Sequence, residues 1–172
     1  MERIADLIRA VADFPAPGIL FRDITPLLAD VQAFGHAIDL LAQPWLDMRI
    51  DAVCAVEARG FIFGTAIASR LGAGFVPLRK PGKLPPPVIG IDYALEYGQD
   101  RLEMRADALA CGNRVLLVDD VLATGGTLSA ARRLIDESGA QLLGASVLIE
   151  LDALPGRAAW GASTPLHALL HY

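Results

Sequence analysis

The sequence predicts an α/β fold in which a mainly parallel, twisted sheet is flanked by helices. Continuous apolar runs of strand length predict buried strands at 51–56, 74–78, 115–118 and 142–151. Helices are predicted after two of these runs, from Gly60 to about Leu71 and from Gly126 onward. Strands that alternate with helices form parallel sheets, because each crossover returns the chain to the same end of the sheet.

The elements before the first strand are predicted from helical spacing and from helix breakers. A first helix is predicted from the spacing of Ile4, Leu7, Ile8 and Val11. The segment 14–18 then interrupts regular structure with two prolines and one glycine. A second, amphipathic helix is predicted over 31–42 from the spacing of Phe34, Ile38 and Leu41.

The middle of the chain contains an irregular segment rich in proline. Residues 81–87 include four prolines and one glycine, which predicts a mobile loop. The pattern over 93–105 predicts a hairpin that turns near Gly98. Gly139 is predicted to end the helix that starts at Gly126, since glycine is common just past a helix C-terminus. With no repeat, residues 1–172 are predicted to form a single domain.

Composition and charge exclude several classes of protein. Hydrophobic residues make up 53% of the chain, which excludes a disordered protein. No apolar run reaches the roughly 18 residues that span a bilayer. The N-terminus has acids among its apolar residues, unlike a signal peptide. We therefore expect a soluble, cytoplasmic protein. A net charge of −5 gives no general attraction to nucleic acid or to anionic membranes, so neither is an expected partner.

The cysteines and histidines indicate no catalytic or metal site. Cys54 lies in an apolar run and is expected to be buried, whereas Cys111 precedes a turn; two cysteines do not make a disulfide framework. His36, His167 and His171 lack the spacing of metal ligands, so we expect structural roles for them.

The most informative segment runs from Val115 to Thr127, Val-Leu-Leu-Val-Asp-Asp-Val-Leu-Ala-Thr-Gly-Gly-Thr. It begins as a buried strand and ends at a helix start, where free backbone N–H groups favour a phosphate. The glycine pair lets the backbone approach a ligand closely, and Thr124 adds a hydroxyl donor. Asp119 and Asp120 would repel a phosphate, so we expect them to bind sugar hydroxyls or a metal. The segment therefore predicts a ribose 5-phosphate site.

This segment differs from a P-loop and from the G-x-G-x-x-G dinucleotide pattern. It closely resembles the signature of the type I phosphoribosyltransferases, which use phosphoribosyl pyrophosphate (PRPP). The resemblance implies that Asp119 and Asp120 contact the ribose hydroxyls. It also implies that the 5-phosphate is held by Ala123, Thr124, Gly125, Gly126 and Thr127.

The segment 57–64 resembles the pyrophosphate loop of the adenine-specific branch of this family. Arg59 at the predicted helix start adds positive charge where the helix dipole already favours an anion. The resemblance implies a cis peptide bond between Glu57 and Ala58, which turns backbone N–H groups toward the pyrophosphate.

The only lysines of the chain lie close together beside Arg79, in a segment that resembles the family's flexible loop. The alternative explanation for the small number of lysines is a genome that favours arginine over lysine. Their shared position nevertheless indicates a phosphate contact. The resemblance implies a pyrophosphate site formed by Glu57, Ala58, Arg59, Arg79, Lys80 and Lys83.

The N-terminal segment 14–26 resembles the part of these enzymes that covers the base, here called the hood and placed at about residues 1–30. The resemblance implies that Phe21 stacks on the purine. It implies an adenine site formed by Leu20, Phe21, Arg22 and Leu151. Oxopurine enzymes place a lysine at O6, whereas both lysines here belong to the loop. The amine of adenine needs acceptors, which backbone carbonyls supply, so we expect adenine as the base.

The segment 93–98 also matches the adenine-specific enzymes. The match implies three catalytic residues: Glu96 transfers the N9 proton, while Arg59 and Lys83 stabilise the leaving pyrophosphate. It implies Mg²⁺ held mainly by PRPP and water, with no direct protein ligand. It further implies a flexible loop over about 81–97 that closes over the site, and a homodimer that makes AMP and pyrophosphate from adenine and PRPP.

Alternative functions on this fold remain open. The base could instead be hypoxanthine, guanine, xanthine or orotate, which a panel of bases with PRPP and Mg²⁺ would separate. A PRPP-sensing regulator without catalysis is a second alternative. Such regulators usually carry a DNA-binding segment and a basic face, and this sequence has neither. The third alternative is a scaffold protein that binds no ligand, and an experiment that shows PRPP binding would exclude it.

Overall fold

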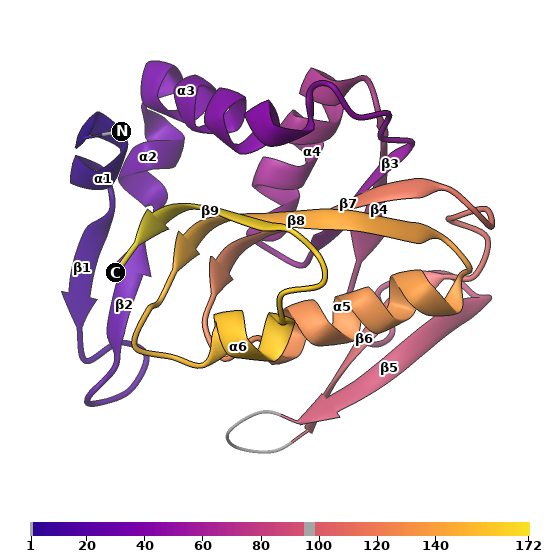
Figure 1. Cartoon of the computed structure of the whole chain (residues 1–172). Coiled ribbons are helices and arrows are strands. Elements are labelled where there is room, and N and C mark those ends of the chain that lie inside the picture. The colour runs from indigo at the N-terminus through magenta and orange to yellow at the C-terminus, as the bar shows by residue number, and fades with distance from the viewer. Residues whose placement is uncertain (1, 95–98) are drawn as a thin grey trace.

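The computed structural model describes residues 2–94 and 99–172, and its centre is a five-stranded sheet (Figure 1). The strand order is β4-β3-β7-β8-β9, and every pairing is parallel. The strands are β3 (Ala52–Val56), β4 (Gly74–Leu78), β7 (Arg114–Leu122), β8 (Gln141–Glu150) and β9 (Leu166–His171). The predicted parallel sheet is confirmed. The carboxyl ends of its strands meet at one edge, where ligands of such sheets bind.

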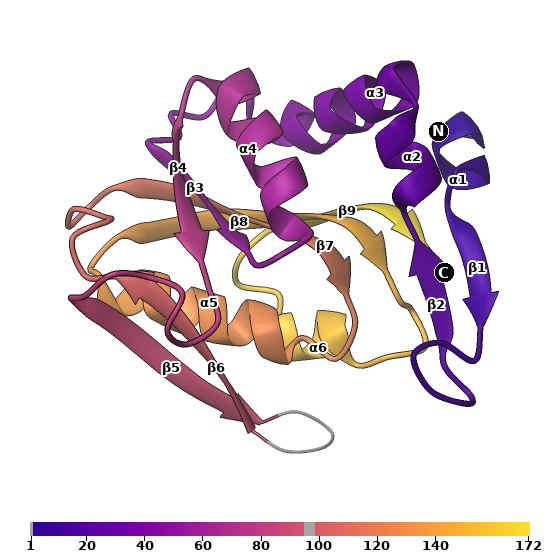
Figure 2. The same cartoon turned by 180° about the vertical axis from the view of Figure 1, so that it is seen from behind.

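Helices cover both faces of this sheet (Figures 1 and 2). On one face pack α3 (Val31–Ala42) and α4 (Gly60–Leu71), and on the other packs α5 (Gly126–Glu137). Two cores result because neighbouring strand residues point to opposite faces: Ala55 belongs to one core and Cys54 to the other. The helices predicted in these three places are confirmed. No helix of the described residues has the length and apolar character needed to cross a membrane.

The described residues also form four shorter helical segments: α1 (Glu2–Asp6), α2 (Thr25–Ala29), the 3-10 turn η1 (Gln43–Trp45) and α6 (Gly156–Trp160). As predicted, Cys54 is buried and Cys111 is exposed.

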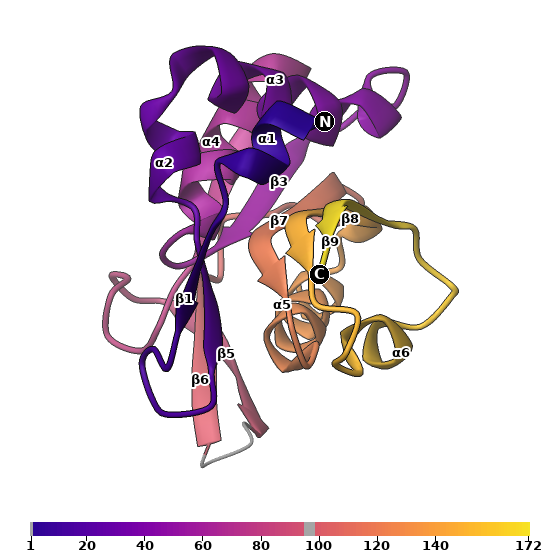
Figure 3. The same cartoon turned by 90° about the vertical axis from the view of Figure 1, so that its left-hand side faces the viewer.

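The first predicted helix is wrong beyond Asp6. After α1, the chain forms β1 (Arg9–Ala12), which pairs antiparallel with β2 (Leu20–Asp23). Val11, which the helical spacing had assigned to the helix, lies opposite Phe21 in this hairpin. Pairing with a more distant segment overrides the weak local preference of a short apolar pattern. The hairpin stands beside the carboxyl edge of the central sheet (Figures 1 and 3).

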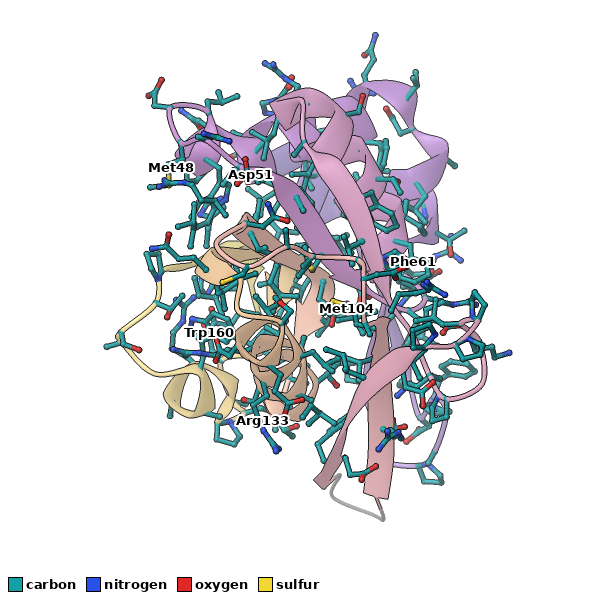
Figure 4. The ribbon with its side chains drawn as sticks, turned by 90° about the vertical axis from the view of Figure 1, so that its right-hand side faces the viewer. Met48, Asp51, Phe61, Met104, Arg133 and Trp160 are labelled. Carbon is teal, nitrogen blue, oxygen red and sulfur yellow. The ribbon has the colours of Figure 1, made fainter. Side chains whose placement is uncertain are left out.

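A second antiparallel hairpin is formed by β5 (Val88–Ala94) and β6 (Gln99–Arg105). It confirms the predicted hairpin, although β5 begins earlier than expected. Within the described part of the loop predicted over 81–97, the chain is irregular before Val88 and forms a strand from there to Ala94, while residues 95–97 lie outside the described residues. The hairpin is anchored by apolar residues that enter the second core, among them Met104, which Figure 4 labels.

The C-terminal part of the chain was not predicted in detail. It adds α6 and then β9, the strand that completes the sheet beside β8. Its mixed composition lacks a clear period, so only pairing with β8 reveals the strand. Beyond β9, Tyr172 contacts β2: the guanidinium carbon of Arg22 lies 3.9 Å from the ring centroid of Tyr172.

Candidate active site

Three hollows adjoin at the carboxyl edge of the central sheet. The smallest, about 60 Å³, is lined by Val121–Leu128. The largest, about 420 Å³, extends from this loop to Glu57–Arg59. The third, about 130 Å³, lies between Phe21 of β2 and Leu151, which follows β8. Val121 lines all three, so the hollows form one branched site.

The smallest hollow is built on the start of α5. All five residues predicted to hold a phosphate, 123–127, line it. Gly125 precedes the helix with φ of 86°, a conformation that other residues rarely adopt. Among the described residues, no side chain caps α5, whereas Asp30 caps α3 by accepting from Gln32 and Ala33. The N–H groups at the start of α5 therefore remain available to an anion.

Two buried carboxyls, Asp119 and Asp120, line the largest hollow from the end of β7. Asp119 comes so close to the start of α4 that a Cβ at Gly60 would lie 2.8 Å from its Oδ1. Glycine at that position therefore makes room for the carboxyl. Burial raises the pKa of both groups, and the neighbouring charge of Asp120 raises the pKa of Asp119 further.

Arg59 connects the carboxyl pair to the base side of the site. Its Nε lies 2.7 Å from Oδ2 of Asp120, and its guanidinium carbon lies 5.0 Å from the ring centroid of Phe21. It lines both the largest hollow and the one beside Phe21. The charge of Arg59 favours the ionised form of Asp120, although burial has the larger effect on the pKa of this carboxyl.

Oδ2 of Asp120 is buried, yet it receives no well-aligned hydrogen bond from residues 2–94 or 99–172. The contact with Arg59 is therefore an ion pair rather than a directed hydrogen bond. An oxygen of this kind fits a sugar hydroxyl, or a water molecule bound to Mg²⁺, since this ion prefers oxygen donors and keeps several waters.

Glu57 and Ala58 are joined by the expected cis peptide bond. The Glu57 carboxylate accepts from Nε of Arg79 at 3.2 Å and from Nη2 at 3.1 Å. It also accepts from the backbone N–H of Lys80 at 3.0 Å. The hydrogen bonds from Arg79 hold the pKa of Glu57 below its ordinary value. Arg79 thus binds Glu57 and does not line the hollow, whereas Glu57 and Ala58 do.

The two lysines lie in different surroundings. Lys80 lines the largest hollow, while its Nζ donates to the hydroxyl of Tyr93 at 3.1 Å and to the carboxylate of Asp100. Burial lowers the pKa of Lys80, but the hydrogen bonds to Asp100 and Tyr93 outweigh it and raise the pKa. Lys83 is exposed and lies outside the lining of the hollow. Sequence reasoning had not identified Asp100 or Tyr93 as partners of Lys80.

All four residues predicted to bind adenine line the hollow beside β2, namely Leu20, Phe21, Arg22 and Leu151. In the part of the chain that the structure describes, β2 pairs only with β1, so its other edge keeps unpaired backbone N–H and C=O groups. Such an edge can bind the rim of a flat ring whose face packs on Phe21. Ile19 and Val121 also line this hollow and were missed. The sequence did offer a signal for Val121, because this residue lies between the carboxyl pair and the predicted phosphate loop.

The proposed proton-transfer residue, Glu96, lies outside the described residues.

Comparison with known proteins identifies the family. A model of the phosphoribosyl transferase domain matches residues 27–160. The adenine phosphoribosyltransferase of Xanthomonas campestris pv. campestris is 58% identical over 165 residues, which cover 96% of this chain and 89% of that protein. The chain belongs to the adenine phosphoribosyltransferase family.

Solved structures of adenine phosphoribosyltransferases share the whole fold. The enzyme from Rhodothermus marinus matches with a TM-score of 0.95 and 46% identity, covering 99% of this chain and 97% of that chain. The enzyme from Saccharomyces cerevisiae matches with a TM-score of 0.90 and 37% identity, covering 98% and 97%. The yeast crystal structure is a complex with adenine and D-2,5-dideoxy-2,5-imino-altritol 1,6-bisphosphate.

Proposed function

We propose that this protein is an adenine phosphoribosyltransferase of purine salvage, which converts adenine and PRPP to AMP and pyrophosphate. The observation that carries the proposal is the order of the three adjoining hollows. An uncapped helix start adjoins a pair of buried carboxyls, which adjoins an apolar hollow beside Phe21. Phosphate, ribose and base follow one another in the same order in AMP. The adenine and bisphosphate bound to the yeast relative support this assignment.

The ribose phosphate is proposed to bind along β7 and the start of α5. Backbone N–H groups of Ala123–Thr127 hold the 5-phosphate, since they lie in the smallest hollow and have no cap. Asp119 and Asp120 accept hydrogen bonds from the ribose hydroxyls. The buried Oδ2 of Asp120, which lacks a well-aligned donor among the described residues, gains one in this way.

The pyrophosphate is proposed to leave toward the start of α4. There Arg59 and Lys80 present positive charge to the largest hollow, and Glu57–Ala58 contribute backbone groups. Arg79 acts by holding Glu57, and Lys83 reaches the pyrophosphate from the loop that precedes β5. Bound together with PRPP, Mg²⁺ would supply positive charge that neutralises part of the pyrophosphate and would keep several waters as ligands. Asp119 and Asp120 line the same hollow, and their carboxylate oxygens can accept hydrogen bonds from its waters.

The base is proposed to bind between β2 and Leu151. Phe21 packs on the ring, and the main chain of Leu20 and Arg22 contacts its edge. N9 attacks C1 of the ribose as the bond to pyrophosphate breaks, and Glu96 takes the N9 proton. A carboxylate in this role contributes about 10²–10⁴-fold to the rate. Closure of the loop over about 81–97 excludes water, which would otherwise hydrolyse PRPP.

As part of the same proposal, the enzyme is cytoplasmic and works as a homodimer, with residues 1–30 as the hood of one domain. Sedimentation of the purified protein tests the dimer directly: a monomer under assay conditions that still forms AMP contradicts it.

AMP formation from adenine, PRPP and Mg²⁺ is the direct test of the function. Parallel reactions with hypoxanthine, guanine, xanthine and orotate test the base, and we expect turnover with adenine. An enzyme that ignores adenine but uses another base would overturn the base assignment.

The ribose assignment is tested by the double variant Asp119→Asn/Asp120→Asn. We expect its turnover to fall by about 100-fold or more, since each carboxyl that binds the diol contributes charge-assisted hydrogen bonds. The control is Asp136→Asn/Glu137→Gln, which changes an exposed acidic pair at the end of α5. Full turnover by the first variant means that the carboxyls do not bind the ribose.

A further inference from the structure

The short helix α6 packs directly against the loop that precedes α5. A Cβ at Gly156 would lie 2.3 Å from the carbonyl oxygen of Ala123 and 2.8 Å from Cδ1 of Leu122. From the other direction, a Cβ at Gly125 would lie 2.9 Å from Cβ of Ala159. There is thus no room for an added methyl group on either side of this contact.

This contact orients one backbone group of the loop. In a planar trans peptide, the C=O and the following N–H point in opposite directions. Because the carbonyl of Ala123 faces Gly156, the N–H of Thr124 points away from α6. The hollow lined by 121–128 contains no residue of α6. The packing of α6 therefore fixes the orientation of this N–H, which belongs to a residue that lines the hollow.

A helix of five residues is not stable alone, so α6 depends on its attachments. One attachment is Arg157, whose Nε donates at 2.8 Å to the carboxylate of Glu150. Its Nη2 donates to the second oxygen of the same carboxylate, and its Nη1 donates to the carbonyl of Leu166 at 2.9 Å. Glu150 is buried. This two-fold, charge-assisted contact fixes α6 to β8 and β9.

The second attachment comes from α5. Nη1 of Arg132 donates to the carbonyl of Trp160 at 3.3 Å, and its guanidinium carbon lies 5.3 Å from the ring centroid of Trp160. Trp160 is buried in the core on this face of the sheet. Figure 4 labels Trp160 and, on α5, the neighbouring Arg133, which is exposed. Helix α6 is thus held from two sides while it contacts the loop.

We propose that α6 is the support of the 5-phosphate loop, and that Gly156 and Arg157 are positioning residues for the phosphate of PRPP. Neither residue lines any of the three hollows, so each acts through the loop and not by touching the substrate. The inference rests on the proposed function, because it assumes that the loop binds this phosphate.

The test measures ribose 5-phosphate binding by calorimetry in wild type, Gly156→Ala and Arg157→Lys. We expect each variant to lose about tenfold in affinity, since a misdirected N–H removes one hydrogen bond to a charged group. In steady-state assays, KM for PRPP should rise by a similar factor. KM for adenine at saturating PRPP, and kcat, should stay within about twofold.

The matched control is Arg133→Lys, which makes the same change on the exposed neighbour and should leave all constants unchanged. Should Gly156→Ala fail to fold, Arg157→Lys decides. Wild-type affinity for ribose 5-phosphate in a folded variant overturns the inference. An equal rise in KM for adenine and in KM for PRPP also overturns it, because such a change indicates general damage to the fold. Wild type that binds no ribose 5-phosphate instead overturns the proposed function itself.

Discussion

Asp119 lies beside a second carboxyl in a buried site, and this arrangement costs stability wherever both are charged. Burial raises its pKa well above the ordinary value, and the charge of Asp120 adds to the shift. A carboxyl whose pKa is raised on folding stabilises the fold while it is protonated. That contribution is lost as the pH rises through the folded-state pKa. The ligand-free site therefore becomes less favourable to the fold as the pH rises from the acid range toward the folded-state pKa.

Asp119→Asn is accordingly expected to raise the Tm of the ligand-free protein at pH 7. The amide oxygen can still accept the N–H of Asp120, which lies 2.9 Å from Oδ1. The gain should shrink toward pH 4, where the wild-type carboxyl is protonated. In a domain of this size, about 1 kcal/mol corresponds to roughly 2–4 °C. Calorimetry across this pH range checks the trend, and a lower Tm of the variant at pH 7 contradicts it.

Phe21 is the aromatic residue of the base hollow, and it packs edge to face on Phe14 with ring centroids 5.1 Å apart. Phe21→Ala should raise KM for adenine about tenfold or more, since stacking on a base contributes roughly 1–3 kcal/mol. KM for PRPP should change little. Phe14→Ala is the control, because Phe14 lies outside the lining of this hollow and its loss should have a smaller effect. Equal effects of the two variants on adenine would exclude stacking by Phe21.

At the scale of elements, the β5–β6 hairpin is tied to the pyrophosphate side of the site. Lys80, which follows β4, donates to Tyr93 of β5 and to Asp100 of β6. The hydroxyl of Tyr93 also donates to Asp100 at 3.0 Å. A lysine bonded in this way faces the hollow but shares its charge with a carboxylate. Asp100 therefore competes with any anion for Lys80.

The variant Asp100→Asn should remove the competition between this carboxylate and a bound anion for Lys80. We expect pyrophosphate, measured as a product inhibitor against PRPP, to bind several-fold more tightly, because a negative charge near the anion is removed. Asp92→Asn is the control on the same hairpin, since the exposed Asp92 pairs with Arg101 outside the hollow. Weaker inhibition by pyrophosphate in Asp100→Asn would mean that Asp100 holds Lys80 in a productive position.

At the scale of the whole molecule, a buried polar contact joins α3 and η1 to the central sheet. The indole N–H of Trp45 donates to Oγ of Ser146 at 2.7 Å, and this hydroxyl donates to the carbonyl of Leu41 at 3.1 Å. Both side chains are buried. The contact connects residues about one hundred positions apart and lies outside the three hollows.

Ser146→Ala should destabilise the protein by about 1–3 kcal/mol, because it leaves a buried N–H without an acceptor. Urea unfolding measures this loss, and Ser69→Ala on the exposed side of α4 is the control. Both KM values should remain as in wild type. A Ser146→Ala variant as stable as wild type means that Trp45 finds another acceptor.

Prediction from the sequence succeeded where the deciding residues are neighbours in the chain. The strand, carboxyl pair and glycine pair from Val115 to Thr127 carry their own chemistry, since a strand that runs into a helix start places acids and free N–H groups together. The buried runs and helices around them follow from local periodicity. The parallel sheet, the family and most of the residues that line the three hollows could therefore be predicted from the sequence.

Contacts between distant segments were not accessible in this way. The pairing of Val11 with Phe21 replaced a predicted helix by a strand. The acid partners of Arg79 and Lys80 lie more than 15 residues away, at Glu57 and Asp100. The packing of Gly156 against the phosphate loop is likewise a meeting of separate elements. Such contacts depend on how the sheet brings its loops to one edge, and local sequence patterns do not predict that arrangement.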